Sequence, residues 1–266
     1  MPWLALTLQV ERAAAEAFSD ALLKAGAQSV ALEGASMLAV LELGADSNAL
    51  VSEAARACGI APPRFTIEQL DDQDWVRMSQ AQFAPLTVGK RLWVGPSWHD
   101  PPAARIAIRI DPGLAFGTGS HPSTRLVLGF LEETLRGGER VLDYGCGSGI
   151  LAIAAAKLGA AAVDAVDLDP LALDTTRANA LANGVELAAV LPDALPAADY
   201  DVVVSNILAQ PLIVLAPLLA QRGARVALSG ILEAQADEVA RAYEPWLPMT
   251  IADRDEGWVL LLGIKK

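Results

Sequence analysis

The amino-acid sequence predicts a small α+β domain of ferredoxin-like topology, followed by a larger α/β domain with a doubly wound, Rossmann-like sheet. Two observations lead to this prediction. Residues 1–68 follow the order strand, helix, strand, strand, helix, strand, which is the split βαβ pattern. From about residue 105, apolar strands alternate with amphipathic helices, which is typical of a parallel sheet covered on both faces. The 266 residues suffice for both domains.

The elements of domain 1–68 follow from their hydrophobic periodicity. We expect strands at 3–10, 28–32, 37–43 and 64–70, and helices at 11–25 and 46–58. Residues 69–104 contain three tryptophans, at positions 75, 93 and 98. Because solvated linkers rarely hold so many large apolar side chains, we interpret this segment as a connector that packs on the second domain.

Domain 105–266 is the predicted doubly wound domain. Its strands are expected at 105–110, 140–144, 162–167, 187–191, 200–205, 224–229 and 257–263, and its helices at 121–135, 149–158, 170–183, 208–221 and 233–244. In open parallel sheets, ligands bind at the carboxyl ends of the strands, where the strand order reverses. The glycine-rich turn after 140–144 therefore places that strand at the centre.

That turn also indicates a cofactor. Residues 141–151 read VLDYGCGSGIL, and the next strand ends at Asp167, twenty residues after Gly147. Such a strand, glycine turn, helix, strand and acid unit binds adenosine-containing cofactors. A dinucleotide fingerprint would require glycine at position 150, which is isoleucine, and Asp143 would repel a pyrophosphate. S-adenosylmethionine, with an ammonium and a sulfonium but no phosphate, fits instead.

Each residue of this unit has an expected role. Gly145 and Gly147 allow the backbone to approach the cofactor, because any Cβ would obstruct it. Asp143 is expected to meet the methionyl ammonium, and Asp167 to accept hydrogen bonds from the ribose hydroxyls. Asp169, directly before Pro170, should instead cap the next helix. Asp193, after strand 187–191, is either an adenine contact or an ordinary loop aspartate.

A second cluster, residues 111–124, reads DPGLAFGTGSHPST. Its glycines predict a loop that closes over the methionine end of the cofactor, with Phe116 excluding water and Thr124 donating its hydroxyl. Ser120 and Pro122 can start the following helix. His121 fits a capping or packing role better than that of a base.

The third cluster is Asn206, which ends the apolar segment VVVSN. A buried amide needs hydrogen-bond partners, so Asn206 is either satisfied by loop backbone or serves a substrate. In the second interpretation its carboxamide oxygen accepts from a substrate nitrogen and aims the lone pair of that nitrogen at the methyl group.

The composition limits the possible binding partners and the cellular compartment of the protein. A net charge of −12 and a pI near 4.6 disfavour a nucleic-acid site and suit either plain solubility or a basic protein partner. Cys58 and Cys146 are too few for a disulfide framework or a zinc site, so we expect no metal and a cytoplasmic protein with reduced thiols. The apolar run 202–220 contains two prolines and three uncharged polar residues, which favours a buried strand and helix over a membrane span.

These motifs resemble the ribosomal protein methyltransferase A family, whose members methylate the eleventh protein of the large ribosomal subunit. The matching segments are IDPGLAFGTGSHPST at 110–124, DYGCGSGILAIAA at 143–155, DLDP at 167–170 and NILA at 206–209. The resemblance implies a class I methyltransferase fold for the second domain and a substrate-recognition role for the first. It also implies cofactor contacts at Thr124, Gly145, Asp167 and Asn206.

The resemblance implies repeated methylation of amines, namely the N-terminal α-amine and lysine side chains of one basic ribosomal protein. An alternative is methylation of a small molecule or of a glutamine nitrogen. Glutamine enzymes usually carry an NPPY-like motif, whereas NILA lacks its prolines and its aromatic residue. A regulator that binds the cofactor without turnover is the second alternative.

Overall fold

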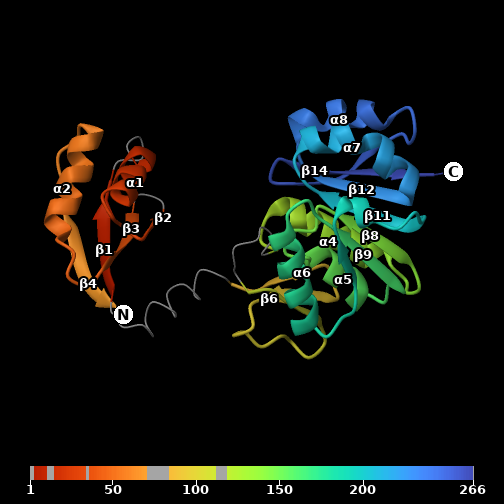
Figure 1. Cartoon of the computed structure of the whole chain (residues 1–266), viewed down its shortest axis with the longest axis horizontal. Helices are drawn as coiled ribbons and strands as arrows, with labels where there is room; N and C mark the ends of the chain where they lie inside the picture. Colours follow the sequence, from red (N-terminus) through yellow and green to blue (C-terminus); the bar gives the residue numbers. More distant parts are fainter. Residues whose placement is uncertain (1–2, 11–14, 34–35, 71–83, 112–118, 266) are drawn as a thin grey trace. The chain divides into compact units, whose positions relative to one another are not determined.

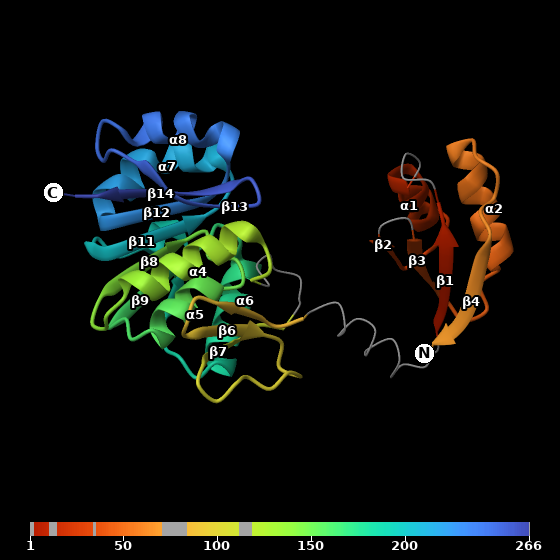
Figure 2. The same cartoon turned by 180° about the vertical axis from the view of Figure 1, so that it is seen from behind.

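The computed structural model describes residues 3–10, 15–33, 36–70, 84–111 and 119–265. The chain divides into two compact units, Met1–Gln82 and Phe83–Lys266 (Figures 1 and 2).

The first unit has the predicted element order: β1 (Trp3–Gln9), α1 (Ala15–Lys24), β2 (Ser29–Glu33), β3 (Ser36–Glu42), α2 (Ser47–Cys58) and β4 (Phe65–Leu70). Its antiparallel sheet has the strand order β2-β3-β1-β4, which is the ferredoxin-like topology. Leu6, Leu8, Phe18 and Met37 lie in a core shared by the sheet and its helices. The predicted α+β fold is confirmed.

The second unit is built on a seven-stranded sheet with the order β10-β9-β8-β11-β12-β14-β13. The strands are β8 (Arg140–Tyr144), β9 (Ala162–Val166), β10 (Ala188–Val190), β11 (Tyr200–Asn206), β12 (Gly223–Leu232), β13 (Thr250–Asp255) and β14 (Trp258–Ile264). The pairs from β10 to β12 are parallel, whereas β14 is antiparallel to both of its neighbours. The strand order reverses between β8 and β11, so the predicted central position of β8 is confirmed.

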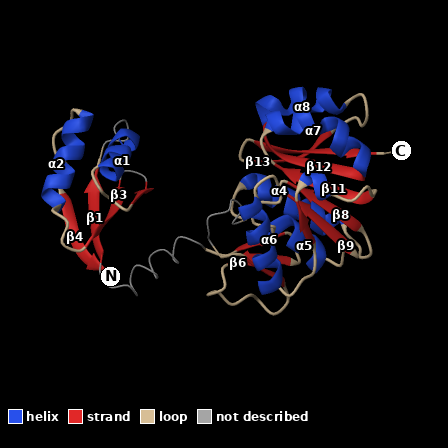
Figure 3. Cartoon of the chain, in the orientation of Figure 1, coloured by secondary structure: helices blue, strands red, loops and turns tan. Residues whose placement is uncertain are grey.

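Helices cover both faces of this sheet (Figure 3). The helices are α4 (Pro122–Thr134), α5 (Ile150–Lys157), α6 (Pro170–Ala182), α7 (Ala209–Arg222) and α8 (Ala236–Tyr243), with 3-10 turns η1 (Pro192–Ala194) and η2 (Glu233–Gln235). Side chains of α4, α5 and α6 share one hydrophobic core, and those of α7 and α8 share a second. The apolar run 202–220 forms β11 and α7, as predicted. In the part of the chain that the structure describes, no helix combines the length and apolarity needed to cross a membrane.

One expectation about the sheet was wrong, and one of its strands was missed. The predicted strand 105–110 forms β7 (Ile106–Arg109), but it pairs with β6 (Leu92–Gly95), which pairs with β5 (Leu86–Val88), in a separate three-stranded sheet. The apolar side chains of these strands pack into the core of α4 and α5, which keeps them off the main sheet. Strand β13 was not predicted, because its sequence TIADRD lacks alternation and is held by hairpin pairing with β14.

Candidate cofactor and catalytic site

The glycine turn lies between β8 and α5, at the switch point of the sheet. Gly145, Gly147 and Gly149 all have positive φ, at +85°, +53° and +78°. A Cβ added at Gly145 would lie 2.3 Å from Cγ2 of Ile207, and one at Gly149 would lie 2.8 Å from Cγ2 of Thr176. Conformation and packing therefore both require glycine at these two positions. The first amides of α5 follow Gly149, which caps the helix without a side chain.

Asp143 lies fully buried beneath this turn. Its Oδ2 accepts a hydrogen bond from the Ala152 amide at 3.0 Å, and its Oδ1 has no partner among the described residues. Burial raises the pKa of Asp143 to about 7; the Ala152 amide opposes the rise, and the charge of Asp167 adds to it. A buried carboxyl with an unpartnered oxygen suits a cationic group. The carboxyl thus fits the ammonium of S-adenosylmethionine, and the contact itself stays a prediction.

Asp167 follows β9 and is half-buried. Its Oδ2 accepts from the Gly147 amide at 2.9 Å and its Oδ1 from the Asp169 amide at 3.0 Å. A carboxylate oxygen can accept more than one hydrogen bond, so both oxygens retain sites for ribose hydroxyls. Asp169 caps α6 by accepting from the Leu171 amide at 2.9 Å, and this part of the prediction is confirmed. Asp193 lies exposed on η1, after β10, and both of its interpretations remain open.

Asn206 and Thr124 come together from segments far apart in the sequence. Asn206 ends β11, and its Nδ2 donates to Oγ1 of Thr124 at 3.1 Å. Thr124 lies on the first turn of α4 and is 4% exposed. The hydroxyl of Ser205 donates to the Tyr144 carbonyl at 2.6 Å, which joins the ends of β11 and β8. The amide nitrogen of Asn206 thus donates to Thr124, and among the described residues no hydrogen bond to its Oδ1 is formed.

The family model of the ribosomal protein L11 methyltransferase (PrmA) matches residues 35–266 of this chain. The chain belongs to that family. A ribosomal protein L11 methyltransferase of Thiobacillus denitrificans is 47% identical over 296 residues, with 100% of both chains covered. The corresponding protein of Bordetella parapertussis is 48% identical over 303 residues, covering 98% of this chain and 99% of that protein.

A solved structure of ribosomal protein L11 methylase from Lactobacillus delbrueckii subsp. bulgaricus is 33% identical, with a TM-score of 0.62. The match covers 68% of this chain and 98% of that one. These findings confirm the resemblance deduced from the sequence. The chain is an S-adenosylmethionine-dependent methyltransferase with the doubly wound class I fold.

Two of the predicted residues lie at or before the start of α4 in this PrmA-family chain. Phe116 lies outside the described residues, so its role as a water-excluding side chain stays a prediction. The cap of α4 is His121 rather than Ser120, because the imidazole Nδ1 reaches the Ser123 amide at 3.3 Å. The same ring contacts Trp258 edge-on, with centroids 4.6 Å apart. The predicted capping and packing role of His121 is therefore confirmed.

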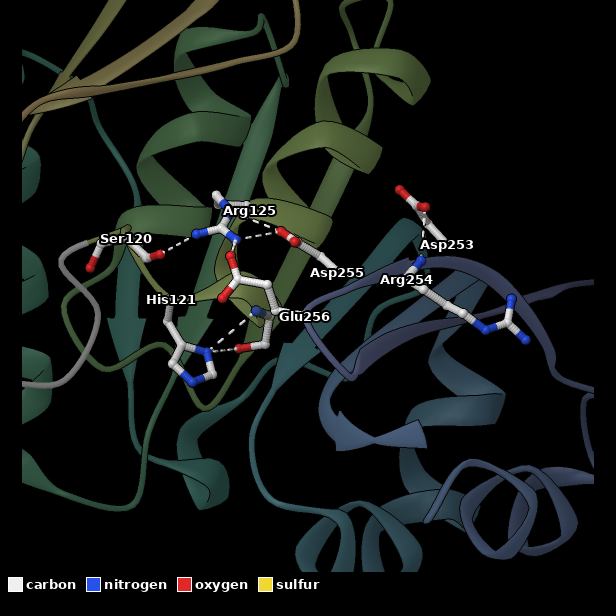
Figure 4. A network of polar contacts seen from close by, with 8 residues as sticks. Ser120, His121, Arg125, Asp253, Arg254, Asp255 and Glu256 are labelled. Atoms are coloured by element: carbon white, nitrogen blue, oxygen red, sulfur yellow. Dashed lines mark hydrogen bonds and ion pairs between the residues drawn. The ribbon is translucent and has the colours of Figure 1, made fainter. Parts of the chain in front are cut away.

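Sequence reasoning missed a polar network beside this cap (Figure 4). Arg125 of α4 contacts the carboxylates of Asp255 and Glu256, at the turn between β13 and β14. Gly257, directly before the apolar segment 258–264, is a signal for a turn at this position. No sequence signal connects the turn to an arginine 130 positions earlier.

Proposed function

We propose that this chain methylates amines of ribosomal protein L11, at the N-terminal α-amine and at lysine side chains. The observation that carries the proposal is the Asn206 carboxamide, fixed by Thr124 at the end of β11. It belongs to the same sheet edge as the glycine turn, in a chain related over its full length to proteins named ribosomal protein L11 methyltransferase.

In this proposal different residues bind the cofactor and the amine. S-adenosylmethionine supplies an electrophilic methyl group on a cationic sulfur. Asp143 and the first amides of α5 would hold its amino-acid end, and Asp167 would hold the ribose. Asn206 Oδ1 accepts one N–H of the incoming amine, which turns the nitrogen lone pair toward the methyl group. Because little new charge forms in this in-line displacement, catalysis rests mainly on positioning.

The amine must lose a proton before it reacts. At pH 7 deprotonation costs about 4–5 kcal/mol for a lysine with a pKa near 10.4, and about 1 kcal/mol for an α-amine near 7.7–8. A neutral carboxamide at position 206 does not stabilise an ammonium as a carboxylate would. Desolvation next to a cationic methyl donor favours the neutral amine, so the proton leaves to water before transfer.

Recognition of the protein substrate is assigned to residues 1–68. This part folds as a separate α+β unit, and the cofactor residues all belong to the other unit. The acidity of the chain suits a basic ribosomal protein. The free cysteines Cys58 and Cys146 suit the reducing cytoplasm.

The test compares Asn206→Ala and Asn206→Asp with wild type, using purified L11, mass spectrometry of its methylation sites, and turnover against pH. The alanine variant should lower turnover far more than cofactor affinity, because positioning acts on the approach to the transition state. The aspartate variant should shift the lysine profile to higher pH, since its charge stabilises the ammonium. Wild-type rates in either variant, or methylation of a glutamine or a small molecule in place of L11, would contradict the proposal.

A further inference from the structure

Arg125, on the first turn of α4, contacts the β13–β14 hairpin through its guanidinium (Figure 4). Arg125 Nε donates to Asp255 Oδ2 at 2.8 Å, and its Nη2 lies 2.7 Å from the same oxygen and 2.8 Å from Glu256 Oε1. Its Nη1 donates to the Ser120 carbonyl at 2.6 Å. All three nitrogens of the planar guanidinium are thereby engaged, so the arginine is held in one orientation.

The hairpin turn keeps its glutamate in an unfavourable backbone conformation. Among the described residues, Glu256 is the one non-glycine residue with a positive φ, +48°, and Gly257 follows at +82°. Asp255 pairs with Trp258, so Glu256 and Gly257 form a two-residue turn. Turns with two positive φ values favour asparagine, aspartate or glycine at the first position. Glutamate has a longer side chain than these residues, and here it contacts Arg125.

The residue before Arg125 connects this network to the proposed catalytic amide. The amides of Thr124 and Arg125 both donate to the His121 carbonyl, at 3.0 and 3.1 Å, so the two residues share one hydrogen-bonded turn. Arg125 faces the hairpin, while the buried Thr124 receives the Asn206 Nδ2 hydrogen bond. Displacement of this turn would therefore move the partner that orients the Asn206 carboxamide.

We propose that Arg125, Asp255 and Glu256 form a clamp that positions Thr124 and, through its hydroxyl, the Asn206 carboxamide for methyl transfer. In this proposal the clamp residues are positioning residues, because they act through Thr124 and Asn206 rather than on the amine or the methyl donor. This inference rests on the proposed function, since it concerns the rate of amine methylation.

A double-mutant cycle on the full chain tests the connection. Arg125→Gln should lower kcat for L11 methylation about tenfold or more, because small misplacements of an orienting group cost large factors in rate. Its Kd for S-adenosylmethionine, measured by calorimetry, should stay within about threefold. In an Asn206→Ala background the same substitution should change kcat by less than about twofold, because the group that it positions is gone.

Glu256→Asn separates positioning from stability. Asparagine suits the positive φ of this turn but is too short to reach Arg125, so we expect an unchanged or higher Tm together with a lower kcat. The control is Asp174→Asn, which removes the exposed Asp174–Arg177 ion pair on α6 and should leave kcat unchanged. A decrease from Arg125→Gln that is equal with and without Asn206 would overturn the clamp, as would wild-type kcat in Glu256→Asn. A wild-type chain that leaves L11 unmethylated would overturn the proposed function, and the clamp with it.

Discussion

The two halves of the proposed site are held in different ways. The cofactor half comprises the glycine turn, Asp143 and Asp167. Its hydrogen bonds join pairs of residues that are separated by 9 or 20 positions in the sequence. The amine half comprises Thr124, Asn206 and the Arg125 clamp. Its hydrogen bonds join pairs of residues that are separated by 82 or 130 positions in the sequence. The cofactor half is thus a local strand–turn–helix–strand unit. The amine half exists only when α4, β11 and the hairpin have assembled.

The two halves meet at Ile207. We expect the largest combined loss of stability and turnover from a substitution that displaces this residue. A Cβ at Gly230 would lie 2.3 Å from the Ile207 carbonyl oxygen, and Gly230 has a φ of +80°. Strain and overpacking in Gly230→Ala should together lower the free energy of unfolding by about 2–4 kcal/mol. Turnover should fall about a hundredfold, because the backbone next to Asn206 must move. Denaturant unfolding and L11 methylation measure the two effects.

Gly145→Ala provides the matched comparison from the cofactor side. There the added Cβ meets the Ile207 side chain rather than its backbone. Shortening that side chain in Gly145→Ala/Ile207→Ala should therefore restore part of the lost turnover, whereas Gly230→Ala/Ile207→Ala should recover none. Equal recovery in both pairs would show that Ile207 does not separate the halves in this way.

The contrast between the two halves explains which features could be predicted from the sequence and which could not. The glycine turn, the central strand β8 and the Asp169 cap are defined by neighbouring residues and by hydrophobic periodicity, so they were found. Thr124 and Asn206 were expected at the cofactor, but their mutual hydrogen bond was not, because it joins two elements. The Arg125 clamp was missed for the same reason. Strand β13, which lacks an apolar pattern, is defined by its partner β14 rather than by its own residues.

Within the cofactor half, Asp167→Ala and Asp169→Ala separate binding from helix capping. Loss of the ribose hydrogen bonds in Asp167→Ala should weaken S-adenosylmethionine binding by about 1.5–3 kcal/mol. Asp169→Ala removes the α6 cap and should lower the free energy of unfolding by about 1 kcal/mol without a comparable loss of affinity. Calorimetry and denaturation on both variants check this. Similar affinities in the two variants would assign Asp167 a purely structural role.

Asp143 should make the cofactor half sensitive to pH. Its pKa is raised from 3.8 to about 7 in the folded chain, chiefly by burial. Between about pH 4 and pH 7 the folded state keeps a proton that the unfolded chain releases, so this group's contribution to stability falls as the pH rises and is constant above pH 7. As the pH rises through that window, wild type should lose stability relative to Asp143→Asn. A difference between the two proteins that is independent of pH would contradict the shift.

Cofactor binding should show the opposite trend at the same residue. The methionyl ammonium favours the ionised form of Asp143, so binding near pH 6 should release a proton, and affinity should rise up to about pH 7. Calorimetry in buffers of different ionisation enthalpy measures the proton release. In Asp143→Asn the release should disappear.

The smallest effect on cofactor affinity is expected from removal of the first unit. The fragment 83–266 retains every described residue of both halves of the site, so its S-adenosylmethionine affinity should stay within about twofold of the full chain. Methylation of L11 should nevertheless fail, because the proposed recognition unit is gone. Full activity on L11 would remove the recognition role from residues 1–68. Loss of cofactor affinity in a folded fragment would show that the cofactor half depends on more than its local unit.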